Sequence, residues 1–305
     1  MLALAGIALV LAAVFGGYIA EKGNPYVLLQ PAELLIVCGS ALGIILIANR
    51  PSLIRKMAQG ATAVFFPPRR TKQSVLRSLR MLYEMFCYAQ RAGVMALEPH
   101  VEEPQSSSIF SRYPELLRDS ATLRFLCDSW RMLVIGATTP QELDHLMDLD
   151  IEIQRRDHLE PVHALSTVAD SLPGLGIVAA VLGVVITMQS IGSSPETVGE
   201  KVAAALVGTF LGILLCYGLV GPVASRLQGL GEAHSQHLEL LRTATVAFAR
   251  GASPILAVEY GRRSVPLEYR PAFDEMEITV RREAEIPPVP PPPGMPEHAE
   301  TVRTA

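Results

Sequence analysis

Four stretches of this chain are long and apolar enough to cross a lipid bilayer, and they constrain its fold more than any other feature. They cover residues 2–20, 34–49, 171–195 and 202–225, and none of them contains a charged side chain. A helix needs about 20 apolar residues to cross a hydrocarbon core about 30 Å thick, because each residue advances it by about 1.5 Å. The sequence therefore predicts an all-α integral membrane protein with four transmembrane helices.

Two of these stretches allow another interpretation. The second is short, and Gln30 and Pro31 stand at its entrance. The first could be a cleaved signal peptide, but it lacks a basic start and a second apolar stretch follows it closely. We therefore expect the first stretch to remain in the protein as an uncleaved membrane anchor.

The basic residues near the spans predict the orientation of the chain, because basic side chains resist translocation and collect on the cytoplasmic side. Segments 21–33 and 192–201 contain only Lys22 and Lys201 as basic residues. The basic residues close to the span ends on the opposite side are Arg50, Arg55, Lys56, Arg69, Arg70, Arg155, Arg156, Arg226 and Arg242. We therefore expect both termini and both large polar segments to be cytoplasmic.

The polar segments show the periodicity of amphipathic helices. Downstream of Thr71, apolar residues recur every three or four positions, and charged residues fall off that stripe. The apolar positions are Val75, Leu79, Leu82 and Phe86, and the charged ones are Arg77, Arg80 and Glu84. We expect a helix there with one packed face and one solvated face.

Two further helices have recognisable end signals. Thr139 and Glu142 can form a capping box around Pro140, so a helix should begin there and lead into the third span. After the fourth span, helical spacing continues until Gly251, and Pro254 follows as a stop signal.

These features divide the chain into five parts. We expect transmembrane helices 1 and 2 in 1–49, a cytoplasmic helical domain in 50–165, transmembrane helices 3 and 4 in 166–225, a cytoplasmic helical region in 226–286 and a disordered proline-rich tail in 287–305. The tail could also be a ligand for a domain that binds extended proline-rich segments.

Composition and motifs exclude several classes of function. Lys and Arg number 26 against 30 Asp and Glu, so the net charge of -4 disfavours nucleic acid as a partner. The sequence contains no phosphate-binding loop and no serine-hydrolase or zinc-protease motif. The spaced histidines, His158 with His163 and His234 with His237, fit solvated helix faces better than a metal site. We therefore expect neither an enzyme nor a resident cofactor or metal.

Pairs of small residues four positions apart mark three of the spans. They are Gly39 with Gly43, Ala179 with Gly183, and Gly208 with Gly212. Such pairs give flat helix faces that let two backbones approach closely. The close packing could join helices within one subunit or helices of neighbouring copies, and the sequence leaves both possibilities open.

The spans also lack an ionisable residue between their ends, although an ion pathway normally needs one. The nearest candidates are Asp170 at the mouth of span three and the hydroxyls of Thr187 and Thr209. If the chain conducts ions, a partner is therefore expected to supply the titrating carboxylate. Pro173 and Pro222 are both expected at the cytoplasmic end of the membrane, where they could form a hinge or simply mark helix ends.

Six segments together resemble one known family. They are VFGGY at 14–18, QPAEL at 30–34, DSLPGLGIVAAV at 170–181, VGTFLGILL at 207–215, AVEYGRR at 257–263 and RP at 270–271. In their residues and their order, these segments resemble those of the MotA family of flagellar motor stators. The resemblance runs from Met1 to about Glu277. The resemblance implies a homo-oligomer of five copies in the bacterial inner membrane, arranged around a MotB dimer. Each MotB helix would bring an aspartate into the pore, and ion flow would turn the ring against the rotor protein FliG.

The resemblance also assigns roles to individual residues. Pro173 and Pro222 match two prolines tied to coupling, and Thr209 and Tyr217 match positions that face the partner helix and the ion path. Ala180 stands where sodium-type relatives carry a threonine, and a methyl group cannot coordinate a dehydrated cation. The resemblance therefore implies that protons drive this protein.

The rotor-facing charges match the family less closely. Glu98 matches the acidic member, but the expected arginine position holds Gln90, with Arg91 next to it. On one continuous helix Arg91 and Glu98 would share a stripe. Pro99 disfavours helical geometry at Glu98, so we expect the alignment to fail there.

Three other functions fit the sequence less well. Ring proteins of the ExbB/TolQ group are related, but they generally have three spans and a large soluble segment between spans one and two. A membrane enzyme would need polar side chains converging at one membrane depth, which the sequence does not show. A passive scaffold would tolerate replacement of Pro173 and Pro222.

Overall fold

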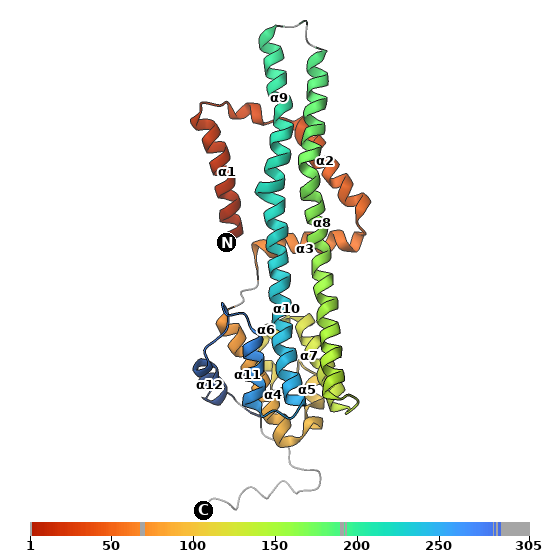
Figure 1. Ribbon diagram of the computed structural model, residues 1–305, viewed down its shortest axis with the longest axis vertical. Helices are drawn as coiled ribbons and strands as arrows, with labels where there is room; N and C mark the ends of the chain where they lie inside the picture. The colour runs from red at the N-terminus through yellow and green to blue at the C-terminus, as the bar shows by residue number, and fades with distance from the viewer. Residues whose placement is uncertain are drawn as a thin grey trace, which may run out of the picture. The chain divides into compact units, whose positions relative to one another are not determined.

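The computed structural model describes residues 2–67, 71–189, 192, 194–282, 284 and 286–287. The proline-rich tail beyond Pro287 therefore lies outside the described residues. Across the described ranges every regular element is a helix (Figure 1). The chain divides into two compact units. The membrane unit comprises the residues up to Pro68 and Arg155–Glu232, and the helical unit comprises Arg69–Gln154 and the residues from Ala233 on.

Four of the described helices are long and apolar enough to cross a bilayer, as many as the sequence predicted. The complete elements of the membrane unit are α1 (Leu2–Ala20), the 3-10 turn η1 (Pro25–Leu28), α2 (Pro31–Ala48), α3 (Pro51–Phe65), α9 (Pro195–Ile213) and the π-helical segment η4 (Leu214–Val220). Parts of α8 (Pro140–Met188) and α10 (Gly221–Ala249) complete it.

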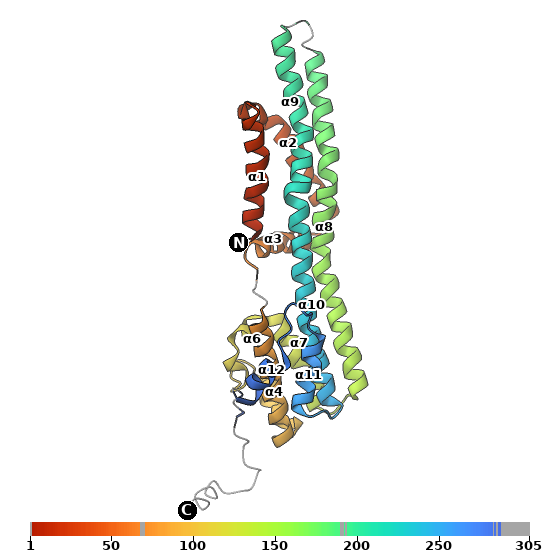
Figure 2. The same ribbon diagram turned by 60° about the vertical axis from the view of Figure 1, so that its left-hand side comes forward.

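Within the membrane unit α8 and α9 run side by side in opposite directions (Figure 1, Figure 2). Glycines allow their backbones to touch. A Cβ atom on Gly176 would lie 2.7 Å from the carbonyl oxygen of Gly208, and one on Gly212 would lie 2.5 Å from that of Leu172. The small residues predicted in spans three and four therefore pack against each other within one subunit.

The other two spans are less enclosed. Helix α2 packs through Val37 and Ala41 in the cluster that contains Leu172 and Ala179 of α8. The pair of small residues in α2 does not take part, because a Cβ on Gly39 or Gly43 would meet nothing within 4 Å. Helix α1 buries none of its side chains in a single described copy. These faces remain available to lipid or to other chains.

The helical unit surrounds an aromatic core. Its complete elements are α4 (Lys72–Ala92), η2 (Val94–Leu97), α5 (Glu98–Glu102), η3 (Phe110–Arg112), α6 (Pro114–Arg118), α7 (Ser120–Val134), α11 (Pro254–Ser264) and α12 (Phe273–Arg282). Phe86 stacks on Phe248 with ring centroids 4.6 Å apart, and both rings contact Trp130. The predicted stripe of α4 from Val75 to Phe86 is buried, which confirms that one face of this helix packs.

The expectation that the charged residues of α4 lie on a solvated face is wrong for Glu84, which is completely buried. Its Oε1 lies 3.1 Å from Nε of Arg80, one turn earlier, and its Oε2 lies 3.1 Å from a guanidinium nitrogen of Arg112 in η3. Two guanidinium groups from different segments thus compensate one buried carboxylate. Periodicity could not predict this, because Arg112 is distant in the sequence.

The predicted helix ends agree with the structure, with one addition. The backbone N–H of Thr139 donates to Oε2 of Glu142 at 2.7 Å, and the N–H of Glu142 donates to the Thr139 hydroxyl at 3.3 Å, so the capping box is confirmed. Helix α10 ends at Ala249, and Gly251 follows with φ +91°. Pro254 follows the end of α10, as predicted, and it is also the first residue of α11.

Candidate functional site

The five predicted coupling residues all lie on α8, η4 and the helices that flank η4. Ala180 and Thr209 come close together at the contact between α8 and α9. A Cβ on Gly208 would lie 3.2 Å from the backbone nitrogen of Ala180, and one on Gly176 would lie 3.2 Å from Cα of Thr209. Tyr217 lies in η4 with 74% of its surface exposed, so it is available to a neighbouring chain.

Pro173 and Pro222 do not lie at one depth, as the sequence had led us to expect. Leu172, next to Pro173, touches Gly212 of the antiparallel helix. Pro222 stands ten residues beyond Gly212, which places it more than about 10 Å farther along the helix axis. The two prolines therefore interrupt the hairpin at two successive levels.

Two prolines lie inside α8, and each removes one backbone donor from a helix that nevertheless continues. Helix α8 runs from Pro140 to Met188 through both Pro161 and Pro173. Proline has no N–H, so the carbonyls of Asp157 and Ala169 lack their usual helical donors. Pro161 was not singled out by the sequence, because it precedes the apolar stretch.

A π-helical segment ends two residues before Pro222. Over Leu214–Val220 the backbone is wider than an α-helix, and the N–H of Gly221 donates to the carbonyl of Cys216, five residues earlier. A Cβ on Gly221 would lie 2.9 Å from that carbonyl oxygen, so glycine suits this close approach. Single π-helical turns are uncommon and often mark functional sites. The sequence showed only the combination of Gly218, Gly221 and Pro222.

Glu33 belongs to the second apolar helix, although the sequence had placed it just before that span. Helix α2 begins at Pro31 rather than at Leu34, so Glu33 falls in its first turn. Its side chain turns inward, and the residue is only 7% exposed. The available signal was Pro31 itself, because proline is common at the first position of a helix.

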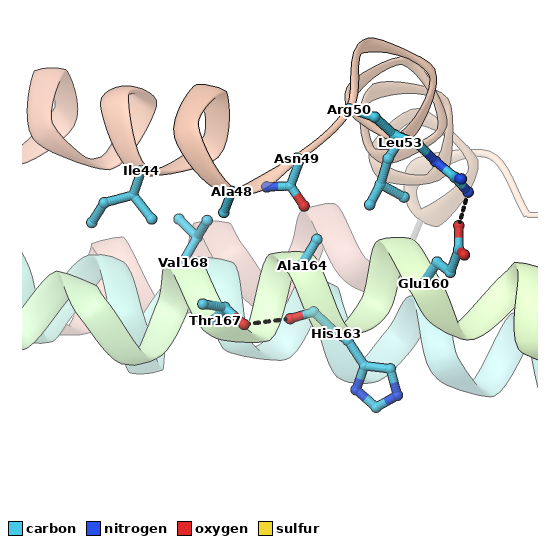
Figure 3. Close-up of a pocket in the computed structure, with 10 residues that line it drawn as sticks. All are labelled: Ile44, Ala48, Asn49, Arg50, Leu53, Glu160, His163, Ala164, Thr167 and Val168. Atoms are coloured by element: carbon cyan, nitrogen blue, oxygen red, sulfur yellow. Dashed lines mark hydrogen bonds and ion pairs between the residues drawn. The ribbon is translucent and has the colours of Figure 1, made fainter.

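A groove lies where the end of α2 meets α8 (Figure 3). It has a volume of about 590 Å³, with apolar walls formed by residues such as Ile44 and Val168. At one end Arg50 binds Glu160 at 2.7 Å, and one turn away Lys56 of α3 binds Asp157 of α8 at 2.6 Å. These ion pairs attach the start of α3 to the part of α8 that precedes Pro173.

The two predicted rotor-facing charges lie in the helical unit, on different elements. Arg91 is in the last turn of α4, whereas Glu98 opens α5, and Gly93 with φ +87° separates them. The expectation of one shared helical stripe is therefore wrong. The expectation that Pro99 would prevent helical geometry is also wrong, because Glu98 has φ -48° and ψ -55°. Proline is tolerated in a first helical turn. Both charged residues are exposed.

The short helix that bears Glu98 is held in place by side-chain contacts to neighbouring segments. Nδ1 of His100 lies 2.8 Å from the Ser107 hydroxyl, and the imidazole ring packs edge-on against Tyr88. Burial lowers the pKa of His100, so the ring is neutral at pH 7. Arg131 of α7 binds Glu102 at 2.7 Å. These contacts fix α5 and leave Glu98 as a solvent-facing charge.

Comparisons with known proteins agree with this architecture. Residues 4–93 match the family described as Motility protein A N-terminal, and residues 118–240 match the MotA/TolQ/ExbB proton channel family. Motility protein A of Escherichia coli is 36% identical over 281 residues, which are 92% of this chain and 95% of that protein.

Two solved structures have a similar backbone. One is that of C. jejuni MotAB, with a TM-score of 0.73 and 20% identity, over 87% of this chain and 96% of the other. The second is the flagellar MotAB stator complex from Bacillus subtilis, with a TM-score of 0.71 and 23% identity, over 90% of this chain and 98% of the other. Together the comparisons confirm the resemblance drawn from the six sequence segments: this chain belongs to the motility protein A family, the flagellar stator subunits of the MotA/TolQ/ExbB proton channel group, rather than to any family of enzymes.

Proposed function

We propose that this stator subunit lies in the bacterial inner membrane with both termini in the cytoplasm, and that five copies surround a MotB-like partner. The partner would contribute a single membrane span with an aspartate, and the ring would turn the rotor switch protein FliG. The observation that carries the proposal is the α8–α9 hairpin. Its apolar parts, 171–188 and 202–213, contain no ionisable residue, so an ion passing along them needs a carboxylate from another element.

Exposed apolar residues on the same hairpin support an assembly. Ile177, Val181 and Ile186 of α8 are each more than half exposed in a single copy, as is Leu206 of α9. These side chains point in several directions around the helices, so lipid on one side does not account for all of them. A ring places some of them against neighbouring copies and others against the partner helix.

The ExbB/TolQ alternative is less well supported. Its members generally have three spans, whereas the described part of this chain has four candidate spans, two of them before the helical unit. The match to the Motility protein A N-terminal family covers those first two spans. A stator subunit is therefore the favoured function.

The proposed orientation can be tested by cysteine labelling in intact cells. Gln189 is exposed at the end of α8, and Gln73 is exposed at the start of α4. A membrane-impermeant thiol reagent should label Gln189→Cys but should label Gln73→Cys only after the cells are opened. The unsubstituted protein gives the background, because three of its four cysteines are buried and Cys38 is half-buried. Labelling of Gln73→Cys in intact cells would overturn the orientation.

The driving ion is expected to be the proton. Ala180 lies at the contact between α8 and α9 and offers a methyl group where a coordinating oxygen would favour sodium. Rotation should therefore persist when external sodium is replaced by potassium at constant membrane potential, and it should fall when the proton gradient is removed. Rotation that stops with sodium removal would contradict the proposal.

The rotor contact is expected to depend on Arg91 and Glu98 together. An exposed ion pair contributes only about 0 to 1 kcal/mol, so neutralising either residue alone should leave torque nearly unchanged. Reversing both charges converts two attractions into two repulsions and should impair swimming strongly. Swimming speed of the single and double variants at equal expression measures this. A normally swimming double reversal would place the contact elsewhere, with Arg77 the next exposed charge on α4 to test.

A further inference from the structure

Glu33 occupies a space formed by two glycines of the α8–α9 hairpin. Its Oε2 would lie 2.5 Å from a Cβ on Gly208, and its Oε1 would lie 3.3 Å from a Cβ on Gly183. Any larger residue at Gly208 would therefore collide with the carboxyl group. Three elements meet here: the first turn of α2, the apolar part of α8 and the middle of α9.

The position of Glu33 along α8 places it inside the apolar part of the unit. Helix α8 ends at Met188, five residues beyond Gly183, which corresponds to about 8 Å. Next to Gly183, the hydroxyl of Thr187 is buried and donates to the Gly183 carbonyl at 2.8 Å. That hydroxyl is thus already used within its own helix.

The Glu33 carboxyl has no compensating charge from the elements packed against it. Beyond Glu33, helix α2 and η1 contain no charged residue, and neither does α8 between Ser171 and Met188. The nearest charged residues on α9, Glu196, Glu200 and Lys201, precede Gly208 by at least seven residues, or about 10 Å. Glu21 and Lys22, in the turn before η1, are exposed to solvent.

One oxygen of the carboxyl also lacks a hydrogen bond, because Oε2 is buried without a partner among the described residues. A polar side chain that served only to hold helices together would be expected to have its hydrogen bonds satisfied. An ionised carboxylate left unpaired in such a setting is costly. The site therefore suits a group that carries a proton or receives a passing cation.

We propose that Glu33 is a proton-binding carboxyl of the conduction pathway, contributed by this chain itself in addition to the aspartate of the partner. The inference rests on the proposed stator function. Its location supports it, because a Cβ on Gly208 would lie 2.5 Å from Oε2 of Glu33 and 3.2 Å from the backbone nitrogen of Ala180. Glu33 is thus close to Ala180, which we predicted to belong to the ion pathway. In a ring, each copy adds one such carboxyl.

Carbodiimide modification tests proton binding without requiring rotation. Dicyclohexylcarbodiimide partitions into apolar regions and reacts with protonated carboxyl groups there. The complex co-purified with its MotB-type partner should be modified at Glu33, progressively less as the pH is raised, while the exposed Glu196 and Glu200 remain unmodified. Peptide mass spectrometry separates this site from the partner's aspartate. A Glu33 that stays unmodified at every pH, or that reacts no faster than Glu196, overturns the proposal.

The isosteric variant Glu33→Gln tests whether the bound proton matters for conduction. Glutamine keeps the size and polarity of the side chain but cannot titrate. The variant should co-purify with the partner normally, yet its rotation speed should depend less steeply on external pH, at constant membrane potential, than that of the wild-type stator. Glu33→Asp should restore that dependence in part. A wild-type pH profile in Glu33→Gln would reduce Glu33 to a packing residue, whereas a wild-type complex that neither conducts nor rotates would contradict the stator function instead.

Discussion

Replacing Pro173 or Pro222 with alanine should stop rotation almost completely while the subunit still enters the membrane and still binds its proposed partner. Alanine restores the N–H that proline lacks, so at position 173 the carbonyl of Ala169 regains a helical donor, and position 222 gains a donor at the end of the π-helical segment. The local helix then stiffens. Motility of each variant, measured beside co-purification of the partner, gives the result.

The physical reason is the small energy available for each ion. One elementary charge crossing 100 mV releases about 2.3 kcal/mol, roughly four times thermal energy. That amount can bias a ring between neighbouring positions but cannot repeatedly remodel a rigid helix bundle. The moving elements must therefore be compliant before the ion arrives, and helices with missing hydrogen bonds have this property.

The structure refines the hinge hypothesis. Pro173 and Pro222 interrupt the hairpin at two levels, because Leu172 adjoins Gly212 rather than residues near Pro222. The π-helical segment Leu214–Val220 lies in the chain between these levels. The compliant region is therefore a length of the hairpin rather than a single plane, and each proline should be needed separately.

Pro161 provides a matched control for these variants. It also lies inside α8, but in the part that Arg50 and Lys56 attach through Glu160 and Asp157. Pro161→Ala should therefore swim nearly as well as the wild type. Full motility in both Pro173→Ala and Pro222→Ala would mean that these prolines only mark helix ends, and loss of co-purification would mean that they act in assembly.

The elements were predictable where local chemistry alone determines them. The apolar stretches fixed the four candidate spans, and the capping box at Thr139 fixed the start of α8, because each signal is complete within a few neighbouring residues. The packed stripe of α4 followed from its spacing in the same way.

The errors occurred where distant segments determine the environment of a residue. Glu84 was expected in solvent but is buried, since the compensating Arg112 comes from a different element. Glu33 was expected outside the second span, and only the approach of Gly208 from α9 explains its inward position. The same applies to the two prolines, whose depths depend on the register between α8 and α9. The residue pattern of one helix does not show how that helix is aligned along its neighbour.

Gly212→Ala should destabilise the membrane unit strongly, whereas Gly43→Ala should leave a single subunit unaffected. The new methyl group at position 212 would lie 2.5 Å from the carbonyl oxygen of Leu172 and 3.0 Å from Cα of Gly176. Both neighbours are backbone atoms, so the two helices must separate. Overpacking of this kind typically costs about 1 to 3 kcal/mol. The thermal unfolding temperature of the detergent-solubilised complex should therefore fall clearly.

Gly43→Ala is the matched control, because it adds the same methyl group to another glycine of a small-residue pair. Nothing lies within 4 Å of that position in one copy of the chain. If the variant behaves like the wild type, the Gly39 and Gly43 face meets lipid. If instead its ring dissociates in size-exclusion chromatography while the subunit remains helical, that face packs on another chain. A Gly212→Ala complex with wild-type stability would show that α8 and α9 do not touch as closely as the structure has them.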